Sequence, residues 1–357
     1  MRIVDVNPFF YPFMGGIEHR MHDTCKLLAE RGHDVTILTG RLPGTPETEE
    51  RDGYNIVRLR SRIINIYNPP FISSKNVLET LNGLDADIVN YNYRWAPSYN
   101  KDLMRYTGKK VFTYHNVWGE GTGLTGWLSG MQDNRFRKCL ETFDHIICVS
   151  DFVRSDLIRR GIPENRTTSV PSCLNLFPDV RDDEGDFILS LGRLVRTKGL
   201  DDLIEAMRHV DAKLIICGKG PDMGRLIRKI EKNGLGDKIE MRGYVSEEEK
   251  AELMGTCKFF VMPSLFESFG LAAVEAMSYG RPMICTNVNG LGDTVGDGGI
   301  IVPAKDPNAL ARAMNMLLDD DDDMRLNIGK AARARAETFS WNDNITKIEE
   351  VYKNVIG

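Results

Sequence analysis

The sequence predicts an α/β fold of two domains, and three observations support this. Short runs rich in valine and isoleucine alternate with longer segments of helical period almost throughout, which is typical of strand and helix units around parallel sheets. The chain has 357 residues, enough for about two domains. One polar stretch near the middle, from Asp179 to Gly185, interrupts the alternation, which restarts directly after it.

The first half supplies the elements of one Rossmann-like domain. Its first helix is indicated by apolar residues at helical spacing that end at a glycine, namely Ile17, Met21, Cys25, Leu28 and Gly32. The expected strands, in chain order, are Arg2–Val6, Val35–Leu38, Asp87–Tyr91, Val111–Tyr114 and Ile146–Val149.

The second half repeats this rhythm and predicts a second Rossmann-like domain. Its expected strands are Phe187–Leu191, Lys213–Cys217, Lys238–Met241, Phe259–Met262, Pro282–Thr286 and Ile300–Val302, each followed by a helix-sized segment. We expect an N-terminal domain over residues 1–176, a C-terminal domain over 177–340, and a helix over 341–357 that crosses back to the N-terminal domain, with residues 176–185 as the linker. Two such domains facing each other leave a central cleft outside the carboxyl ends of both sheets, where open sheets of this kind bind ligands.

Composition narrows the class of partner and the compartment. The chain has 46 basic and 51 acidic residues, a net charge of −5, so no nucleic-acid partner is expected. Its seven cysteines are widely spaced with no C-x-x-C pair, which favours reduced core cysteines over a metal or redox site. No apolar run approaches the roughly 18 residues of a membrane span. These features predict a cytoplasmic protein.

Two glycines, Gly15 and Gly16, follow the first strand and open the first helix. Bare N–H groups at a helix N-terminus favour an anion, and the missing side chains allow close approach. A purely structural turn is the alternative on these residues alone. The segment does not match the G-x-G-x-x-G fingerprint, which disfavours an oxidoreductase.

Three further residues lie in loops at the predicted cleft. His115 ends the fourth expected strand, where it is either a site residue or a structural histidine. Arg193 and Lys198 share one loop after the first strand of the C-terminal domain, with glycines on both sides. Two fixed cations at this place suit a diphosphate whose charge grows as it leaves. Solvated loop cations are the alternative.

The segment from Pro263 to Met277 is the most informative one. It leaves a strand, forms a loop that contains Glu267, and enters a helix near residue 269 or 270, so that Glu275 lies a turn or more inside the helix. Carboxylates at these two places can accept hydrogen bonds from hydroxyl groups. The backbone N–H groups at the start of the helix are expected to hold a phosphate or a sugar hydroxyl, and they belong to Phe269, Gly270 and Leu271.

These motifs, in this order, resemble those of a retaining glycosyltransferase with the GT-B fold, in glycosyltransferase family 4 (the group 1 transferases). Glu267 and Glu275 match the family's Glu-x7-Glu motif, and the residues from Ala276 to Pro282 are close to its usual continuation. The family's phosphate-binding arginine and lysine correspond to Arg193 and Lys198. Its glycine-rich first loop and its N-domain histidine correspond to Gly15, Gly16 and His115. The resemblance extends over almost the whole chain.

The resemblance implies transfer of a hexose-type sugar from a nucleoside-diphosphate sugar to a glycan, lipid or small-molecule acceptor, with retained anomeric configuration. A UDP- or GDP-sugar is the expected donor. No metal ion and no other cofactor is expected, since two cations and helix dipoles can stabilise the leaving diphosphate.

The resemblance also implies roles for individual residues. Glu275 is expected to hold the ribose hydroxyls, and the diphosphate is expected on the two cations and the glycine loop. The implied catalytic residues, which also contact the sugar, are His115 and Glu267. The implied donor-binding residues are Gly15, Gly16, Arg193, Lys198, Phe269, Gly270, Leu271 and Glu275.

Two segments depart from the family pattern. Ser172 to Asn175 stands where the family usually has Asn-Gly-Val-Asp, and Asp293 replaces a common glutamate. Both border the expected cleft, so the choice of donor stays open. Two other functions also stay open: a nucleotide-sugar epimerase or hydrolase of the same fold, which needs no acceptor, and a non-catalytic nucleotide-sugar binder.

The acceptor side is expected in a glycine-rich, partly apolar loop from Gly119 to Gly130, beside His115. If Leu124, Trp127 and Leu128 of this segment form an exposed surface, they allow peripheral contact with the inner face of the cytoplasmic membrane, as for an enzyme with a lipid-linked acceptor. Core packing of these side chains is the alternative.

Overall fold

The structure is a computed structural model that describes residues 1–64, 71–121, 124–319 and 322–357. It divides into two compact units. Unit 1 comprises Met1–Asn175 and Trp341–Gly357, and unit 2 comprises Leu176–Ser340. Parallel sheets with helices on both faces make up each unit, so the predicted α/β class is confirmed.

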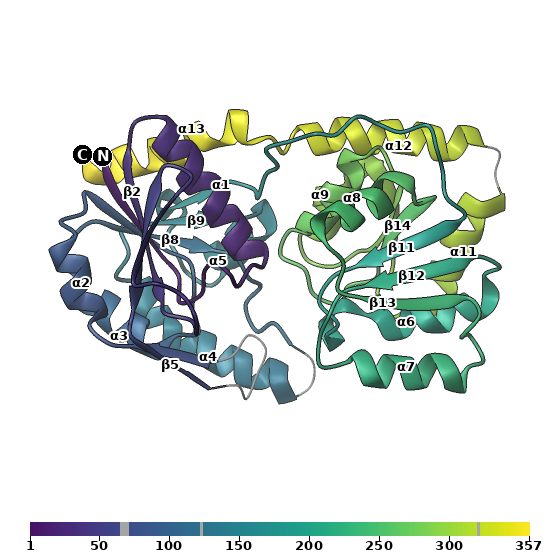
Figure 1. Ribbon diagram of the computed structural model, residues 1–357, viewed down its shortest axis with the longest axis horizontal. Coiled ribbons are helices and arrows are strands. Elements are labelled where there is room, and N and C mark those ends of the chain that lie inside the picture. The colour runs from purple at the N-terminus through teal and green to yellow at the C-terminus, as the bar shows by residue number, and fades with distance from the viewer. Residues whose placement is uncertain (65–70, 122–123, 320–321) are drawn as a thin grey trace. The chain divides into compact units, whose positions relative to one another are not determined.

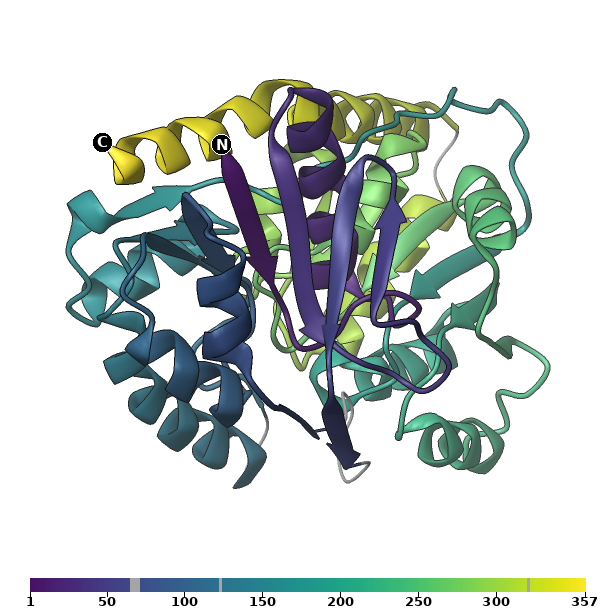
Figure 2. The same ribbon diagram turned by 60° about the vertical axis from the view of Figure 1, so that its left-hand side comes forward.

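Unit 1 contains, within the described residues, a sheet of eight strands in the order β10-β9-β8-β7-β1-β2-β4-β3. Neighbouring strands run parallel except β3, which runs antiparallel to β4. Figure 2 shows β1, β2 and β4 side by side with the purple helix α1 packed behind them. The strands are β1 Arg2–Val6, β2 Asp34–Gly40, β3 Thr48–Arg51, β4 Tyr54–Leu59, β7 Ile88–Tyr91, β8 Lys110–Tyr114, β9 His145–Cys148 and β10 Thr167–Ser169, and a separate hairpin pairs β5 Ser61–Ile64 with β6 Phe71–Ser74.

The helices of unit 1 bury one face each, as their sequence period requires. In α13 (Trp341–Ile356) the buried residues recur every three or four positions. This helix crosses over α1 (Gly16–Glu30) and packs against it, as Figure 1 shows. Glu349 of α13 accepts hydrogen bonds from Arg31 at 3.0 Å and His33 at 3.2 Å. The C-terminal helix therefore belongs to unit 1. The remaining helices are α2 Val77–Gly83, α3 Pro97–Arg105, α4 Leu124–Leu140, α5 Asp151–Arg159 and the short η1 Glu164–Arg166.

The sequence predictions for unit 1 were incomplete in two places. All five expected strands are present within a few residues, but β3 to β6 and β10 were not predicted. β3 is a charged edge strand without valine or isoleucine, a composition that blunts sheet edges and carries no apolar signal. The expected loop from Gly119 to Gly130 was wrong over much of its length: residues 122–123 lie outside the described residues, and the chain is helical from Leu124. Burial of Phe136 and Leu140 further along α4 outweighs the low helix propensity of its two glycines.

Unit 2 contains, in the part of the chain that is described, a sheet of six parallel strands in the order β13-β12-β11-β14-β15-β16. All six expected strands are present: β11 Phe187–Leu191, β12 Lys213–Cys217, β13 Ile239–Gly243, β14 Phe259–Met262, β15 Met283–Thr286 and β16 Gly299–Val302. The chain moves outward from β11 in one direction through β12 and β13, and in the other direction through β14 to β16. The loops after β11 and β14 thus diverge at a topological switch point, the usual ligand position in such sheets.

Helices cover both faces of the unit 2 sheet. In Figure 1, α6 and α7 lie on one side of the strands and α8 and α9 on the other. One apolar core joins α6, α7 and α11 to the sheet. The helices are α6 Leu200–Ala206, α7 Met223–Lys232, α8 Glu247–Thr256, α9 Leu271–Ser278, α10 Leu291–Val295, α11 Pro307–Asp319 and α12 Asp322–Glu337, with the short η2 Arg196–Lys198, η3 Met207–His209 and η4 Gly296–Gly298.

The expected linker is fixed to unit 2 rather than free. Arg281 donates hydrogen bonds to the carbonyl oxygens of Arg181 at 3.1 Å and Asp183 at 2.9 Å, and Gly185 N–H donates to Thr256 O at 2.6 Å. Among the described residues, no helix is long and apolar enough to cross a membrane.

We predict that Ile348→Ala destabilises unit 1 by about 2–5 kcal/mol, because the side chain is only 3 % exposed and its removal leaves a cavity under α13. The control is Glu350→Ala, on the exposed face of the same helix, which should change stability by less than about 0.5 kcal/mol. Urea denaturation followed by circular dichroism measures both. Equal effects of the two variants would contradict the packing of α13 described above.

Candidate functional site

Two loops at the switch point of unit 2 are bonded to each other. The N–H groups of Leu265 and Phe266, after β14, donate to the carbonyl oxygen of Thr197, after β11, at 2.7 and 3.3 Å. This registers the loops so that Lys198 Nζ lies 2.5 Å from Glu267 Oε2. The two side chains are 22 % and 15 % exposed, so the ion pair is partly shielded from water.

Glycines allow these loops to approach backbone to backbone. A Cβ atom on Gly199, where φ is +65°, would lie 1.8 Å from the carbonyl oxygen of Pro263. A Cβ atom on Gly218 would lie 1.9 Å from the carbonyl oxygen of Gly192. No other residue fits at either position without moving the loops, since real Cβ atoms do not approach oxygen so closely. The loops after β11, β12 and β14 are therefore packed as one layer.

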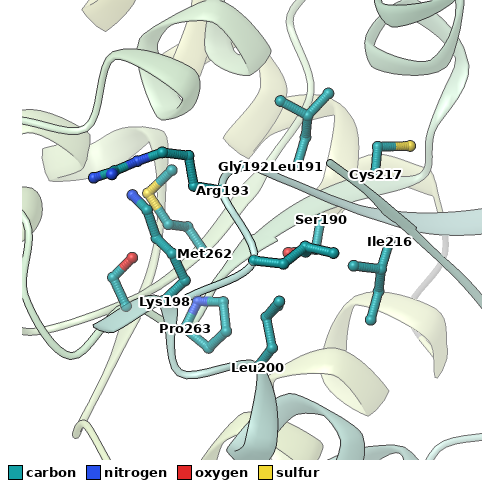
Figure 3. Close-up of a pocket in the computed structure, with 12 residues that line it drawn as sticks. Ser190, Leu191, Gly192, Arg193, Lys198, Leu200, Ile216, Cys217, Met262 and Pro263 are labelled. Carbon is teal, nitrogen blue, oxygen red and sulfur yellow. The ribbon is translucent and has the colours of Figure 1, made fainter. Parts of the chain in front are cut away.

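Arg193 is an unpaired cation of this layer. Its side chain makes no hydrogen bond or ion pair with any residue that the structure describes, and the residue is exposed. Figure 3 shows Arg193 and Lys198 extending to the same side of a pocket that Gly192, Met262 and Pro263 also line. One free cation beside one paired cation leaves net positive charge here, which suits an anion.

Glu275 lies on α9, inside the helix as the sequence predicted, and its partner is Lys250 of α8. Lys250 Nζ lies 3.4 Å from Glu275 Oε1 and 2.6 Å from Glu247 Oε2. Burial raises the pKa of Glu275 above its usual value, and Lys250 opposes this shift. A side chain 26 % exposed can still receive hydroxyl donors, so Glu275 is a partly buried acceptor.

The helix α9 begins at Leu271, so Phe269 and Gly270 precede it. Gly270 is its N-cap with φ +94°, and Phe269 is buried edge-on against Phe339 with ring centroids 5.2 Å apart. The first-turn N–H groups of Leu271 and Ala272 have no acceptor within the helix. Such N–H groups favour an anion at the start of the helix.

In unit 1, His115 directly follows β8 and is buried. Its Nε2 atom lies 3.0 Å from Asn92 Oδ1. Burial, and then the positive charge of Arg20, holds the pKa of His115 well below its usual value. The imidazole is therefore neutral at physiological pH and can donate one hydrogen bond and accept another.

The glycine loop of unit 1 is partly engaged by the protein itself. Gly15 is the N-cap of α1, and its N–H donates to Glu18 Oε2 at 3.0 Å, while Asn7 Nδ2 donates to the other oxygen of Glu18 at 2.9 Å. Gly16 is the first residue of α1, and a Cβ atom there would meet nothing within 4 Å. The space at Gly16 is open to a ligand, whereas the Gly15 amide already has an acceptor.

The structure thus brings together Arg193, Lys198 and Glu267 in unit 2, with the start of α9 following in the same loop. Glu275 lies one turn further along α9. The expected residues Gly15, Gly16 and His115 belong to unit 1. Within the described residues there is no cluster of three or more His, Cys, Asp or Glu side chains that could hold a metal ion.

Sequence reasoning missed three residues around these sites: Lys250, Asp5 and Asn92. Lys250 follows three glutamates and looks like a solvated charge, but it precedes the buried Leu253 and Met254 by three and four residues. That helical spacing places it on the inward face and could have revealed it. Asp5 and Asn92, which lie behind His115, stand in or next to apolar strands and gave no comparable signal.

Solved structures define the class of this fold. The chain is similar to a sucrose-phosphate synthase from Thermosynechococcus elongatus, with 23 % identity, a TM-score of 0.81, and coverage of 99 % of this chain and 98 % of that one. It is also similar to the Anabaena protein HepE in complex with UDP and glucose, with 17 % identity, a TM-score of 0.78, and coverage of 99 % and 100 %. Two Rossmann-like units of this kind make up a GT-B glycosyltransferase.

Family comparisons then identify the family. The family model described as "Glycosyltransferase Family 4" matches residues 14–176, and the model described as "Glycosyl transferases group 1" matches residues 175–335. An uncharacterised glycosyltransferase of Methanocaldococcus jannaschii is 29 % identical over 97 % of this chain and 96 % of its own length. A phosphatidylinositol N-acetylglucosaminyltransferase component from Arabidopsis thaliana is 24 % identical over 100 % of this chain and 82 % of its own length. The chain belongs to the group 1 glycosyltransferases of family 4, as its motifs predicted.

We predict that Gly199→Ala disrupts the loop layer, because its Cβ atom would collide with Pro263 O. Gly234→Ala is a matched control: φ is +66° there, close to the +65° of Gly199, but a Cβ atom would meet nothing within 4 Å. The control should lose about 1 kcal/mol from the left-handed conformation alone. Gly199→Ala should lose more and should also weaken nucleotide binding. Urea denaturation and calorimetric titration with UDP measure the two effects, and equal behaviour of the variants would contradict the close packing.

Proposed function

We propose that this glycosyltransferase moves a hexose from a UDP- or GDP-sugar to a lipid-linked or glycan acceptor, with retention of configuration and without a metal ion. Transfer from a nucleotide sugar is the activity of its family. The observation that carries the finer proposal is the free Arg193 beside the Lys198 and Glu267 pair at the switch point of unit 2.

The diphosphate of the donor is proposed to lie on Arg193 and Lys198. As the bond from the sugar to the diphosphate breaks, negative charge develops on the phosphate oxygens, and fixed cations stabilise that charge more in the transition state than in the ground state. The N–H groups at the start of α9 add partial positive charge. These groups supply what a metal ion supplies in other enzymes.

The ribose hydroxyls are proposed to donate hydrogen bonds to Glu275. Its carboxylate must be ionised to accept both, although its burial favours the protonated form. Lys250 provides the compensating charge at 3.4 Å. Glu275 and Lys250 therefore act together as one ribose-binding pair.

The transferred sugar is proposed to contact Glu267, His115 and the backbone of Phe269, Gly270 and Leu271. Glu267 and His115 are the catalytic residues of this proposal, because they touch the sugar as the acceptor attacks from the face that the diphosphate leaves. The open space at Gly16 supports a role of the Gly15 and Gly16 loop in holding the diphosphate.

The donor nucleotide is proposed to be UDP in the first instance. The solved structure of HepE, which shares the fold, contains UDP and glucose. The segments that depart from the family pattern, around Cys173 and Asp293, leave GDP as the alternative for direct comparison.

The acceptor is proposed to be lipid-linked, with the enzyme cytoplasmic and peripheral at the inner face of the membrane. The name of the Arabidopsis relative indicates a phosphatidylinositol acceptor. On α4, Trp127, Leu128 and Met131 are 62, 51 and 37 % exposed, and Arg135 and Lys138 are exposed further along the same helix. Apolar side chains beside cations suit an anionic lipid surface.

The experiment that tests this function is a calorimetric panel of UDP, GDP, ADP and their sugar conjugates, with EDTA present. We expect binding of one nucleotide and its sugar conjugate, followed by turnover only when an acceptor is added. Failure of every nucleotide to bind would contradict the donor site. Fast product formation without acceptor would favour the epimerase or hydrolase alternative, and binding without any turnover would favour a binding protein.

Removal of either donor-site cation should slow catalysis. We predict that Arg193→Ala and Lys198→Ala each lower kcat by about 10²-fold or more, since each removes stabilisation of developing charge. The matched control is Arg196→Ala in the same loop, because Arg196 is 56 % exposed and faces Asp201 and Asp222 at 3.7 and 3.5 Å. Its kcat should stay close to wild type in steady-state assays. Equal losses in all three variants would indicate general loop damage instead.

Nucleotide affinity should fall on the acid side as Glu275 becomes protonated, at a pH above its usual pKa of 4.5. Lys250→Met removes the charge that lowers this pKa, so the loss of affinity should begin at higher pH. Glu247→Gln is the matched control with the opposite sign, because Glu247 raises the pKa of Glu275. Calorimetric titration with UDP from pH 5 to 8 measures both, and differences from wild type cancel the titration of the nucleotide itself. Shifts in the same direction would contradict the Glu275 assignment.

Membrane contact through α4 should depend on Trp127. We predict that Trp127→Ser reduces co-sedimentation with vesicles containing anionic lipid, since a large apolar side chain leaves the interface. The control is Met104→Ser, at an apolar residue of α3 that is 45 % exposed. Vesicle binding that is unchanged by Trp127→Ser would remove the membrane proposal and leave the donor site untouched.

A further inference from the structure

A chain of buried hydrogen bonds runs behind His115 in unit 1. Asp5 of β1 accepts from Asn90 Nδ2 at 3.1 Å and from Asn92 Nδ2, and Asn92 Oδ1 lies 3.0 Å from His115 Nε2. Asp5, Asn90 and Asn92 are each less than 5 % exposed. Buried polar side chains in a hydrogen-bonded core are costly unless every member is satisfied, so the direction of each hydrogen bond is constrained.

The groups that can only accept determine which atom donates in each of these hydrogen bonds. The amide nitrogen of Asn92 faces the carboxylate of Asp5 and, at 3.3 Å, the carbonyl oxygen of Val6. A carbonyl oxygen can only accept, and an ionised carboxylate can only accept. The amide of Asn92 must therefore present its nitrogen to them and its oxygen to His115. An amide oxygen cannot donate, so the hydrogen of that last bond belongs to His115 Nε2.

We propose that Asn92, held by Asp5, is a positioning residue that fixes His115 in the neutral tautomer with hydrogen on Nε2, leaving Nδ1 to accept a hydrogen bond from a sugar hydroxyl. The hydrogen bonds of His115 within the described residues engage Nε2 and not Nδ1. Only the contact with the sugar rests on the proposed function. The tautomer is a property of the free protein.

The wild-type tautomer is measured first, by nitrogen-15 spectroscopy of the histidine rings in the full chain without ligand. His115→Gln assigns the two ring signals by subtraction. Hydrogen on Nε2 and an unprotonated Nδ1 are the expected result. Hydrogen on Nδ1 would overturn the inference while leaving the donor site of unit 2 unaffected.

Asn92→Leu and Asn90→Leu form a matched pair. The two asparagines lie two positions apart, at the end of β7, and donate to the same oxygen of Asp5, but only Asn92 contacts His115. Asn92→Leu should mix the His115 tautomers and lower kcat at least about tenfold with little change in donor KM. Asn90→Leu should keep the tautomer and most of kcat despite a comparable loss of stability. Equal kcat losses at equal stability would show a merely structural role and overturn the proposal.

Asn92→Asp is the conservative variant and adds a pH signature. When protonated, the introduced acid can donate to Asp5 and still accept from His115 Nε2, so the tautomer and kcat should be retained at low pH. At higher pH two adjacent carboxylates would repel each other, and kcat should fall more than in wild type. The titratable and charged groups that face Asp5 are Arg20 and Cys25 on α1 and Tyr352 on α13, all unchanged in this variant. A loss of kcat that does not depend on pH would overturn the proposed positioning role of Asn92.

The outcomes separate this inference from the proposed function. If the wild-type tautomer is as expected but His115→Gln turns over at the wild-type rate, the contact of His115 with the sugar is overturned both here and in the proposed function. If Asn92→Leu does not fold, the wild-type spectrum and the Asn92→Asp profile still decide the question.

Discussion

The site in unit 2 depends on one constraint: the loops after β11, β12 and β14 touch backbone to backbone. Gly199 and Gly218 make this possible, because a Cβ atom at either position would lie within 2 Å of a carbonyl oxygen of the facing loop. Hydrogen bonds to Thr197 O then join the loops after β11 and β14. These contacts also restrain the side chains that the loops carry. Lys198 and Glu267 meet across this junction. The junction therefore restrains these loop charges more than unpaired loops would.

In unit 1, the residues around His115 are held in position by contacts between side chains rather than between backbones. Around His115 the polar groups are buried, and their positions are fixed because each donor needs an acceptor. Burial raises the pKa of Asp5 to about 6, partly offset by the amides of Asn90 and Asn92. Burying polar groups costs free energy, so a network of this kind is expected where the direction of a hydrogen bond matters. In unit 2 direction matters less than net charge, and Arg193, a cation with no partner among the described residues, lies exposed at the surface.

Sequence reasoning reached the fold and most of the unit 2 site for a physical reason. Strands such as β11 and β14 are largely apolar runs, and the loops after them must lie at one edge of a parallel sheet. Arg193, Lys198 and Glu267 could therefore be placed from their order alone. Long-range partners could not. Whether Lys250 turns inward, or whether the Gly15 amide is already held by Glu18, is decided by packing between elements. Edge strands such as β3, polar on both faces, leave no apolar pattern to read.

The Lys198 and Glu267 pair also bears on which ligand the proposed donor site retains. A diphosphate that displaces the carboxylate from Lys198, now at 2.5 Å, breaks one ion pair to form another. Glu267, only 15 % exposed, is then left without its cation, a loss of about 1–3 kcal/mol unless new donors replace it. The hydroxyls of a bound sugar supply such donors, and a nucleoside diphosphate without a sugar does not. In the proposed function, such displacement would favour the intact donor over the product that remains after transfer and would ease release of that product.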